Sequence, residues 1–258
     1  MTPDFSHLVV EISGPIASLR LDRPKKLNAL SLGLLQEITA AAQWLDTQPD
    51  VRCVIVEGNG AAFCAGADLD GFPSAGDPSV RAAADAGRIM ADAVTSMNAV
   101  TIASIHGWCV GGGLVLASAC DLRVAAESAR FSIPEIALGI PLAWGGIPRL
   151  VRELGPAITK ELVITCREFS ADEASAFGFL NRVVEEGERQ PAARSLADQI
   201  VDKPSMPVAV TKQHVNAVSE EMGSTLNAWS DADGLLTGLS DPECEQARQA
   251  YLRSKLGG

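Results

Sequence analysis

The sequence predicts an α/β fold followed by a helical C-terminal region. The chain opens with two short β-branched runs and one amphipathic segment of helical periodicity, a ββα arrangement. Further strand-like and helix-like segments then alternate as far as about residue 190, which predicts packed layers of strands and helices. From Pro191 onward the pattern is helical, so we expect a boundary at this point between residues 1–190 and residues 191–258.

The first ββα unit can be assigned in order. Residues 8–12 and 16–21 flank Ser13-Gly14-Pro15, which predicts a β-hairpin. Ser31 is the expected N-cap of the following helix. The apolar positions of that helix recur at helical spacing and are Leu34, Leu35, Ile38, Ala41, Ala42 and Leu45.

Two predicted strands are followed by small residues. Residues 51–58 precede the segment 61–69, and residues 99–105 precede a turn with three glycines, Gly111–Gly113, that opens an apolar helix. Unpaired N–H groups at such a helix start suit a negatively charged oxygen. Two such strand exits could supply the two backbone donors of an oxyanion hole, although a tight packing turn is the alternative.

The middle of the chain predicts one long helix and several capped elements. Residues 79–98 form the helix, with an apolar stripe through Ile89, Ala93, Val94 and Met97, and we expect its methionines to fill the core rather than line a pocket. Ser170 is the expected N-cap of a later helix, with Glu173 completing a capping box.

Composition excludes several classes of protein. The 258 residues carry a formal net charge of −11, which argues against a nucleic-acid-binding surface. The six cysteines form no C-x-x-C pair and there are only three histidines, so we expect buried thiols in a reducing compartment and no metal site. We see neither a secretory signal nor an apolar run of about 20 residues. These observations predict a cytoplasmic protein without a membrane segment.

One carboxylate stands out by its surroundings. Glu135 lies among Ile133, Pro134, Ile136 and Leu138, at an expected helix start. Apolar neighbours raise the pKa of a carboxyl group by desolvation, which suits proton transfer near neutral pH. The alternative is a structural carboxylate that favours the helix dipole.

Four segments together resemble the crotonase superfamily, also called the enoyl-CoA hydratase/isomerase family. They are Arg23–Leu30, Ala65–Leu69, the glycines Gly111–Gly113, and Pro134-Glu135. Their order and approximate spacing match the family, and the similarity spans nearly the whole chain. The resemblance implies a (ββα)-repeat spiral core carrying an acyl-CoA site, with a C-terminal oligomerisation region that builds homotrimers or dimers of trimers.

The resemblance also assigns site residues. It places the oxyanion hole at the backbone N–H groups of Ala67 and Gly112, and the acid/base at Glu135. It implies contacts with the substrate or its CoA group at Lys25, Ala29, Ala65, Gly66, Asp68, Leu69, Gly111 and Pro134. Lys25 alternatively belongs to a solvated charged corner. CoA is part of the substrate, and no separate cofactor is expected.

The chain departs from the family pattern at one catalytic position. Hydratases of this family carry a second glutamate two residues after the triple glycine, where this sequence has Val115. Valine cannot transfer the proton that hydration requires, whereas one carboxylate suffices to move a double bond from the 3,4 to the 2,3 position. The resemblance therefore favours a Δ3,Δ2-enoyl-CoA isomerase.

Several alternatives stay open. An enoyl-CoA hydratase of fatty-acid β-oxidation would need another acid, for which Asp68, Asp70 and Asp77 are near in sequence. A non-catalytic acyl-CoA-binding member, or a family hydrolase, decarboxylase or dehalogenase, would keep the same fold. Trp144 adds bulk near the expected acyl site or fills the core. No P-loop, dinucleotide-binding or G-x-S-x-G motif is present in the sequence.

Overall fold

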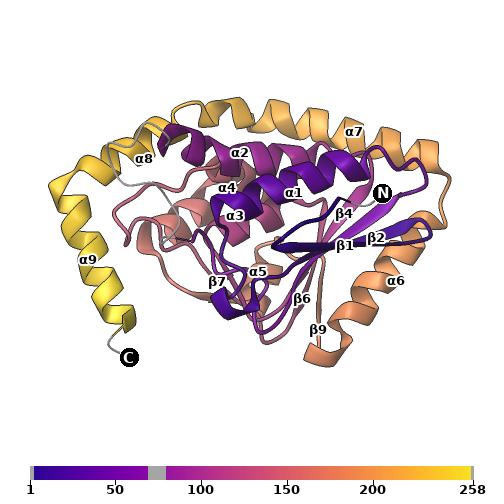
Figure 1. Cartoon of the computed structure of the whole chain (residues 1–258), viewed down its shortest axis with the longest axis horizontal. Helices are drawn as coiled ribbons and strands as arrows, with labels where there is room; N and C mark the ends of the chain where they lie inside the picture. Colours follow the sequence, from indigo (N-terminus) through magenta and orange to yellow (C-terminus); the bar gives the residue numbers. More distant parts are fainter. Residues whose placement is uncertain (1–2, 69–79, 257–258) are drawn as a thin grey trace.

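A six-stranded sheet forms the centre of the computed structural model, which describes residues 3–68 and 80–256 (Figure 1). Its strand order is β1-β2-β3-β4-β6-β9. The bounds are β1 Leu8–Ser13, β2 Ile16–Leu21, β3 Cys53–Gly58, β4 Val100–Ile105, β6 Leu122–Ala126 and β9 Arg182–Val184. The first two strands pair antiparallel, as the predicted hairpin requires, and the other pairs are parallel.

A second, three-stranded sheet runs in the order β5-β7-β8, with bounds β5 Trp108–Val110, β7 Arg130–Ser132 and β8 Phe169–Ser170. A bridge between Cys64 and Cys109 brings the segment after β3 to the same sheet. The elements β4, β5 and α3 (Gly112–Ala119) form one ββα unit, and β6, β7 and α4 (Gly146–Thr165) form the next. Each unit gives one strand to each sheet before its helix, which confirms the predicted ββα repeat.

The first two helices pack by their apolar faces. In α1 (Leu32–Leu45) the Ser31 hydroxyl accepts the N–H of Leu34 at 3.3 Å, and the six apolar residues predicted for its inner face are buried. In α2 (Val80–Thr95) the predicted stripe is partly wrong, because the Ile89 side chain is 46% exposed. Met90 and Met97 are buried in the core, as expected.

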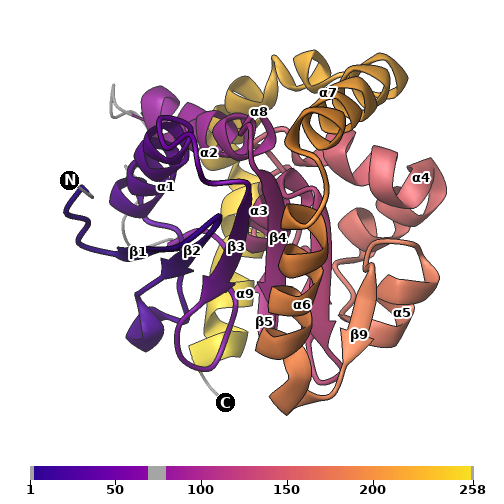
Figure 2. The same ribbon diagram turned by 90° about the vertical axis from the view of Figure 1, so that its right-hand side faces the viewer.

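Helices cover both faces of the large sheet. The layer α1, α2 and α3 lies on one face, and α6 (Arg189–Val201) lies on the other (Figures 1 and 2). Ala193 and Ala197 of α6 pack in one cluster with Cys53, Ile102 and Val124 of the strands. The first helix of the C-terminal region therefore belongs to the packed core.

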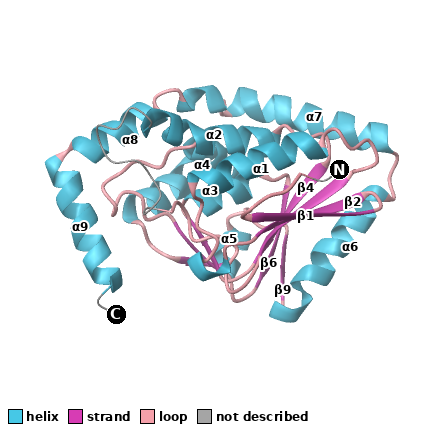
Figure 3. Ribbon diagram, viewed as in Figure 1, coloured by secondary structure: helices cyan, strands magenta, loops and turns pink. Residues whose placement is uncertain are grey.

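The rest of the C-terminal region is helical, as predicted (Figure 3). Its helices are α7 (Ser205–Met222), α8 (Asp231–Ser240) and α9 (Pro242–Leu256). Pro207 lies in the first turn of α7, where its missing N–H has no intrahelical acceptor to lose. A division of the chain into two domains near residue 190, with an oligomerisation role for the second, stays a prediction.

The shortest strands have no pattern from which the sequence could predict them. Four strands, β5, β7, β8 and β9, have three residues or fewer and show no readable alternation. The short helix α5 (Ala171–Ala176) has the predicted capping box, in which the Ser170 hydroxyl accepts the Glu173 N–H and the Glu173 carboxylate accepts the Ser170 N–H. Its local signal could be read directly from the sequence.

The remaining expectations concern membranes and thiols. None of the helices in the described ranges is long and apolar enough to cross a membrane. The six cysteines are free thiols, and Cys53, Cys64, Cys109 and Cys120 are buried, as predicted.

Candidate active site

Each outer glycine of the triplet Gly111–Gly113 makes room for a close neighbour. Gly111 has a left-handed φ of 49°, and a Cβ there would overlap the Glu135 carboxylate and lie 3.0 Å from its Cδ. A Cβ at Gly113 would lie 2.6 Å from the carbonyl oxygen of Cys64. These approaches, rather than flexibility alone, require residues without side chains at the start of α3.

The two expected oxyanion-hole donors lie on adjoining segments. Leu30 donates its N–H to the Gly66 carbonyl at 2.8 Å and accepts the Asp68 N–H at 3.1 Å, so the Ala67 N–H faces the opposite edge of that segment. Gly112 is the first residue of α3, and its N–H has no acceptor within the helix. A Cβ on Gly66 would lie 3.7 Å from the Gly112 nitrogen, so the segments are in close contact.

Glu135 lies on a turn, not at a helix start. The segment after β7 forms turns in which Leu138 donates to the Pro134 carbonyl and Ile140 to the Glu135 carbonyl, each at 3.0 Å, and no regular helix follows until Gly146. The helix-dipole interpretation is therefore wrong, because a single turn has no aligned row of peptide dipoles. The turn instead directs the carboxyl group against Gly111.

The Glu135 carboxyl group is buried, and its pKa is raised. Its Oε2 atom has no hydrogen-bond partner among the described residues. Desolvation raises the pKa of Glu135 to about 7, and a hydrogen bond from its own backbone only partly opposes this. A carboxylate with such a pKa is a stronger base than an exposed one and can both take up and return a proton at neutral pH.

Asp68 is part of an ion pair. Its carboxylate accepts a hydrogen bond from the Arg23 guanidinium at 2.7 Å, and the same guanidinium also donates to the Ala29 carbonyl. The buried Asn28 amide donates to the Ala62 carbonyl at 2.8 Å. These contacts join the segment of residues 23–30 to the segment that carries Ala67, and the Asp68 carboxylate is engaged in this ion pair.

The remaining predicted contacts are distributed around this centre. Lys25 is exposed on a 3-10 turn, Pro24–Lys26. The Ala65 N–H donates to the Leu27 carbonyl at 2.9 Å, which fixes the start of the donor segment. Leu69, Asp70 and Asp77 lie outside the described residues.

Two apolar side chains border the glycine triplet. Val115 is fully buried one turn into α3, with its Cγ2 2.9 Å from where a Cβ on Gly146 would lie. Trp144 is 6% exposed, and its indole packs against Gly112, where a Cβ would overlap the ring. Trp144 therefore both fills the core and forms a wall beside the expected oxyanion hole.

Sequence reasoning missed Tyr251 of α9. Burial first, and then the negative charge of Glu135, raise the pKa of the Tyr251 phenol. Arg248 on the same helix donates from Nε to the Leu138 carbonyl at 3.2 Å. The C-terminal helix thus packs on the turn that carries Glu135, and no local pattern links residues so far apart in the chain.

The described residues hold no set of side chains that could bind a metal ion together. Within the ranges 3–68 and 80–256, no group of three His, Cys, Asp or Glu side chains is arranged to hold a metal ion.

Comparison with known proteins shows the family of this chain. The family model described as enoyl-CoA hydratase/isomerase matches residues 11–252. The chain is 32% identical over 253 residues to the crotonyl-CoA hydratase of Syntrophomonas wolfei, covering 97% of this chain and 96% of that protein. It is 33% identical over 214 residues to a short-chain-enoyl-CoA hydratase of Clostridium acetobutylicum, covering 83% and 82% of the two chains.

Solved structures show the same fold. A crystal structure of an enoyl-CoA hydratase from Bacillus anthracis superposes with a TM-score of 0.80 at 30% identity, covering 96% of this chain and 97% of that one. An enoyl-CoA hydratase/isomerase from Mycobacterium paratuberculosis superposes with a TM-score of 0.88 at 23% identity, covering 96% and 100%. The chain therefore belongs to the enoyl-CoA hydratase/isomerase family, the crotonase superfamily.

Proposed function

We propose that this protein is a Δ3,Δ2-enoyl-CoA isomerase that uses Glu135 as its single acid/base. The observation that carries the proposal is the buried Glu135 carboxyl group, which lies against Gly111 beside the two backbone donors. Val115 occupies the position of a second carboxylate, and the Asp68 carboxylate is paired with Arg23. Among these residues, which lie in the ranges 3–68 and 80–256, Glu135 thus has the one available carboxylate, and one carboxylate supports proton transfer between two carbons of one substrate.

The reaction follows from this geometry. The thioester carbonyl of a 3-enoyl-CoA accepts hydrogen bonds from the N–H groups of Ala67 and Gly112, and Glu135 removes a proton from the α-carbon. The electron pair delocalises into a dienolate whose negative charge rests on the carbonyl oxygen. Each backbone donor stabilises that charge by about 3 kcal/mol. Glu135 then returns the proton to the γ-carbon, which gives the 2-enoyl-CoA with no net gain or loss of atoms.

Hydration is the second candidate, because the relatives above are named hydratases. Addition of water requires one group to activate the water and another to protonate the α-carbon. Glu135 supplies one such group, whereas Val115 cannot supply the other. We infer that hydration is slow relative to isomerisation in this chain.

Product analysis separates these functions. We expect the wild type to convert a 3-enoyl-CoA to the 2-enoyl isomer and to hydrate a 2-enoyl-CoA poorly, and Glu135→Gln to lose the isomerase activity. Rapid hydration of the 2-enoyl substrate by the wild type would overturn the isomerase assignment. Acyl-CoA binding without turnover by either form would instead indicate a non-catalytic binding protein.

The proposed function also extends to the location, cofactor requirement and assembly of the protein. We infer a cytoplasmic enzyme of fatty-acid metabolism that needs no cofactor apart from the CoA carried by its substrate. Lys25 is exposed on the 3-10 turn Pro24–Lys26, and we expect its ammonium group to contact the CoA phosphates. Helix α7 buries no residue within the chain, which supports self-association as a trimer or a dimer of trimers.

A further inference from the structure

We propose that the Trp144 indole restricts the acyl group, so that this protein acts on short-chain acyl-CoA thioesters. This inference rests on the proposed function, since it concerns the acyl group whose carbonyl is held at Ala67 and Gly112. It adds a specificity-determining residue that is neither an acid/base nor a hydrogen-bond donor in the reaction.

The indole is clamped between two glycines. A Cβ on Gly87 of α2 would overlap the fused edge of the indole and Cγ of its five-membered ring, and a Cβ on Gly112 of α3 would overlap the outer edge of its six-membered ring. The ring therefore fills the space between α2 and α3 at the point where α3 begins. A side chain at either glycine would force the ring out.

The glycines Gly111–Gly113 determine where the Trp144 indole lies relative to Glu135 and the expected donor N–H of Gly112. Gly111 touches the Glu135 carboxyl group, and Gly112 carries both an expected donor N–H and the contact with Trp144. A thioester bound with its oxygen at that N–H and its α-carbon facing Glu135 thus has the indole as its neighbour. In the proposed complex, acyl carbons on the α2 side of the site meet this ring, which then limits the length of the chain.

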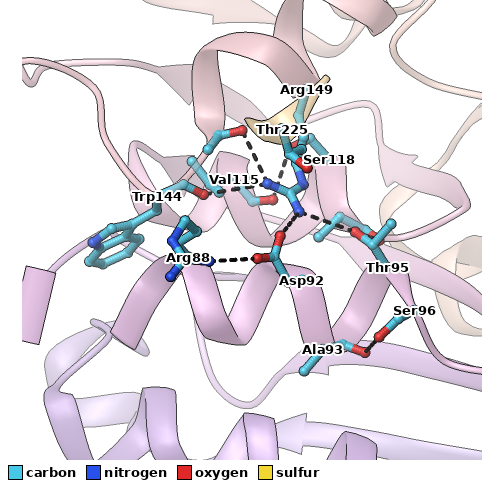
Figure 4. A network of polar contacts seen from close by, with 12 residues as sticks. Arg88, Asp92, Ala93, Thr95, Ser96, Val115, Ser118, Trp144, Arg149 and Thr225 are labelled. Atoms are coloured by element: carbon cyan, nitrogen blue, oxygen red, sulfur yellow. Dashed lines mark hydrogen bonds and ion pairs between the residues drawn. The ribbon is translucent and has the colours of Figure 1, made fainter. Parts of the chain in front are cut away.

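The backbone of Trp144 is held in place from two directions. Trp144 and Gly145 are both left-handed, with φ values of 62° and 68°, a conformation that a tryptophan adopts only when its surroundings impose it. The buried Arg149 guanidinium donates to the carbonyls of Trp144 at 3.5 Å and Gly145 at 3.1 Å (Figure 4). From the other direction, Asp231 of α8 accepts the Gly145 N–H at 2.8 Å.

Arg149 is itself anchored to α2. Its guanidinium donates to Asp92 at 2.8 Å, and its side chain is 1% exposed (Figure 4). Asp92 and Gly87 lie on the same helix, so α2 supplies both a wall for the ring and the anchor for its backbone. An indole fixed in this way is part of a rigid wall, not a side chain that swings aside for a longer substrate.

The test compares chain lengths across a graded series of variants. We measure kcat/KM with six-carbon and ten-carbon 3-enoyl-CoA substrates for the wild type, Trp144→Phe, Trp144→Leu and Trp144→Ala. We expect the wild type to favour the six-carbon substrate by about tenfold or more, and the ratio to fall stepwise as the side chain shrinks. Trp44→Phe, a matched change at a tryptophan of α1 that packs on the core, is expected to keep the wild-type ratio.

A binding measurement separates failure of this inference from failure of the proposed function. Calorimetry with saturated butyryl-CoA and decanoyl-CoA requires no isomerisation, and we expect Trp144→Ala to gain about tenfold in affinity for decanoyl-CoA relative to butyryl-CoA. A wild type that turns over or binds both lengths equally well, or a Trp144→Ala variant with unchanged ratios, overturns the inference. A wild type that does not isomerise 3-enoyl-CoA substrates, but binds the saturated thioesters with the expected dependence on chain length, overturns only the proposed reaction.

Discussion

The Glu135 carboxyl group is buried and lies against Gly111, which has no side chain. At the scale of single residues, the proposed acid/base role depends on this combination, because desolvation makes the carboxylate basic and Gly111 leaves room for it beside the start of α3. The neighbouring donors are backbone amides, so their contribution depends on where the segments lie and not on side-chain chemistry.

The pH profile of the proposed reaction should report the ionisation of Glu135. The base must be deprotonated, and its pKa is raised to about 7, so kcat/KM should increase with pH through about 7 and level off above it. Initial rates of 3-enoyl-CoA isomerisation between pH 5 and pH 9 provide the measurement. A rate that is already level across this range, as for a glutamate with its ordinary pKa of 4.5, would contradict this role.

The same ionisation should affect stability. The folded-state pKa lies above the unfolded value, so the native state retains a proton that the unfolded state loses, and stability falls as pH rises from about 4.5 to about 7. Glu135→Gln removes the buried charge, and its free energy of unfolding at pH 8 should exceed that of the wild type by up to about 3 kcal/mol. At pH 4 the difference should largely vanish.

Urea denaturation at both pH values measures this effect. Glu243→Gln, at an exposed position in the first turn of α9, is a suitable control and should show no comparable pH-dependent gain. An equal effect of Glu135→Gln at pH 4 and pH 8 would show that the carboxyl group is not buried in its charged form.

At the scale of elements, the close approach of α2 and α3 around the Trp144 ring explains why each helix carries a glycine at the contact. Gly87→Ala should destabilise the protein by about 1–3 kcal/mol, because its Cβ would overlap the ring. In the Trp144→Ala background the clash is absent, so the same change should no longer destabilise the protein and should gain the helix propensity of alanine. A double-mutant cycle of urea unfolding free energies measures the coupling.

Gly33 offers a matched control for this cycle. It also lies in a helix, α1, but a Cβ there would meet its nearest neighbour, an atom of the His7 ring, at an ordinary 3.7 Å. Gly33→Ala should therefore stabilise the protein by about 0.5–1 kcal/mol through helix propensity. An additive cycle for Gly87 and Trp144 would show that the ring is not clamped between the two helices.

At the scale of the whole molecule, an apolar surface is left uncovered along α7 and the 3-10 helix Thr225–Ala228. Within the described chain, α7 buries none of its residues, although it is 18 residues long. The exposed apolar side chains of this surface are Met206, Val210, Val215, Val218, Met222, Leu226 and Trp229. A helix of this kind requires a partner surface, and further copies of the same chain would provide one.

Light scattering in solution should therefore show a trimer or a hexamer. The double variant Met222→Asp, Trp229→Asp should shift the protein towards smaller species, because it places charges in an apolar contact. Ile164→Asp changes an exposed apolar residue of α4 and should leave the assembly intact. A monomeric wild type would exclude self-association through this surface.

The sequence by itself determined the features that local patterns encode. The alternation of strands and helices, the Ser31 cap, the capping box at Ser170 and the glycines at the start of α3 could all be read directly, because each depends on neighbouring residues. The approach of the two segments that carry Ala67 and Gly112 followed from the resemblance, and in the structure a Cβ on Gly66 would lie 3.7 Å from the Gly112 nitrogen.

Only the tertiary structure decided the features that distant contacts create. Glu135 lies on a turn, and its carboxyl group meets Gly111. Asp68 forms an ion pair with Arg23, which lies in a different part of the chain. The clamp around Trp144 joins α2, α3 and the start of α4, and α9 packs on the turn of Glu135. No local pattern encodes these contacts, because their free energy arises only when segments far apart in sequence exclude water from one another.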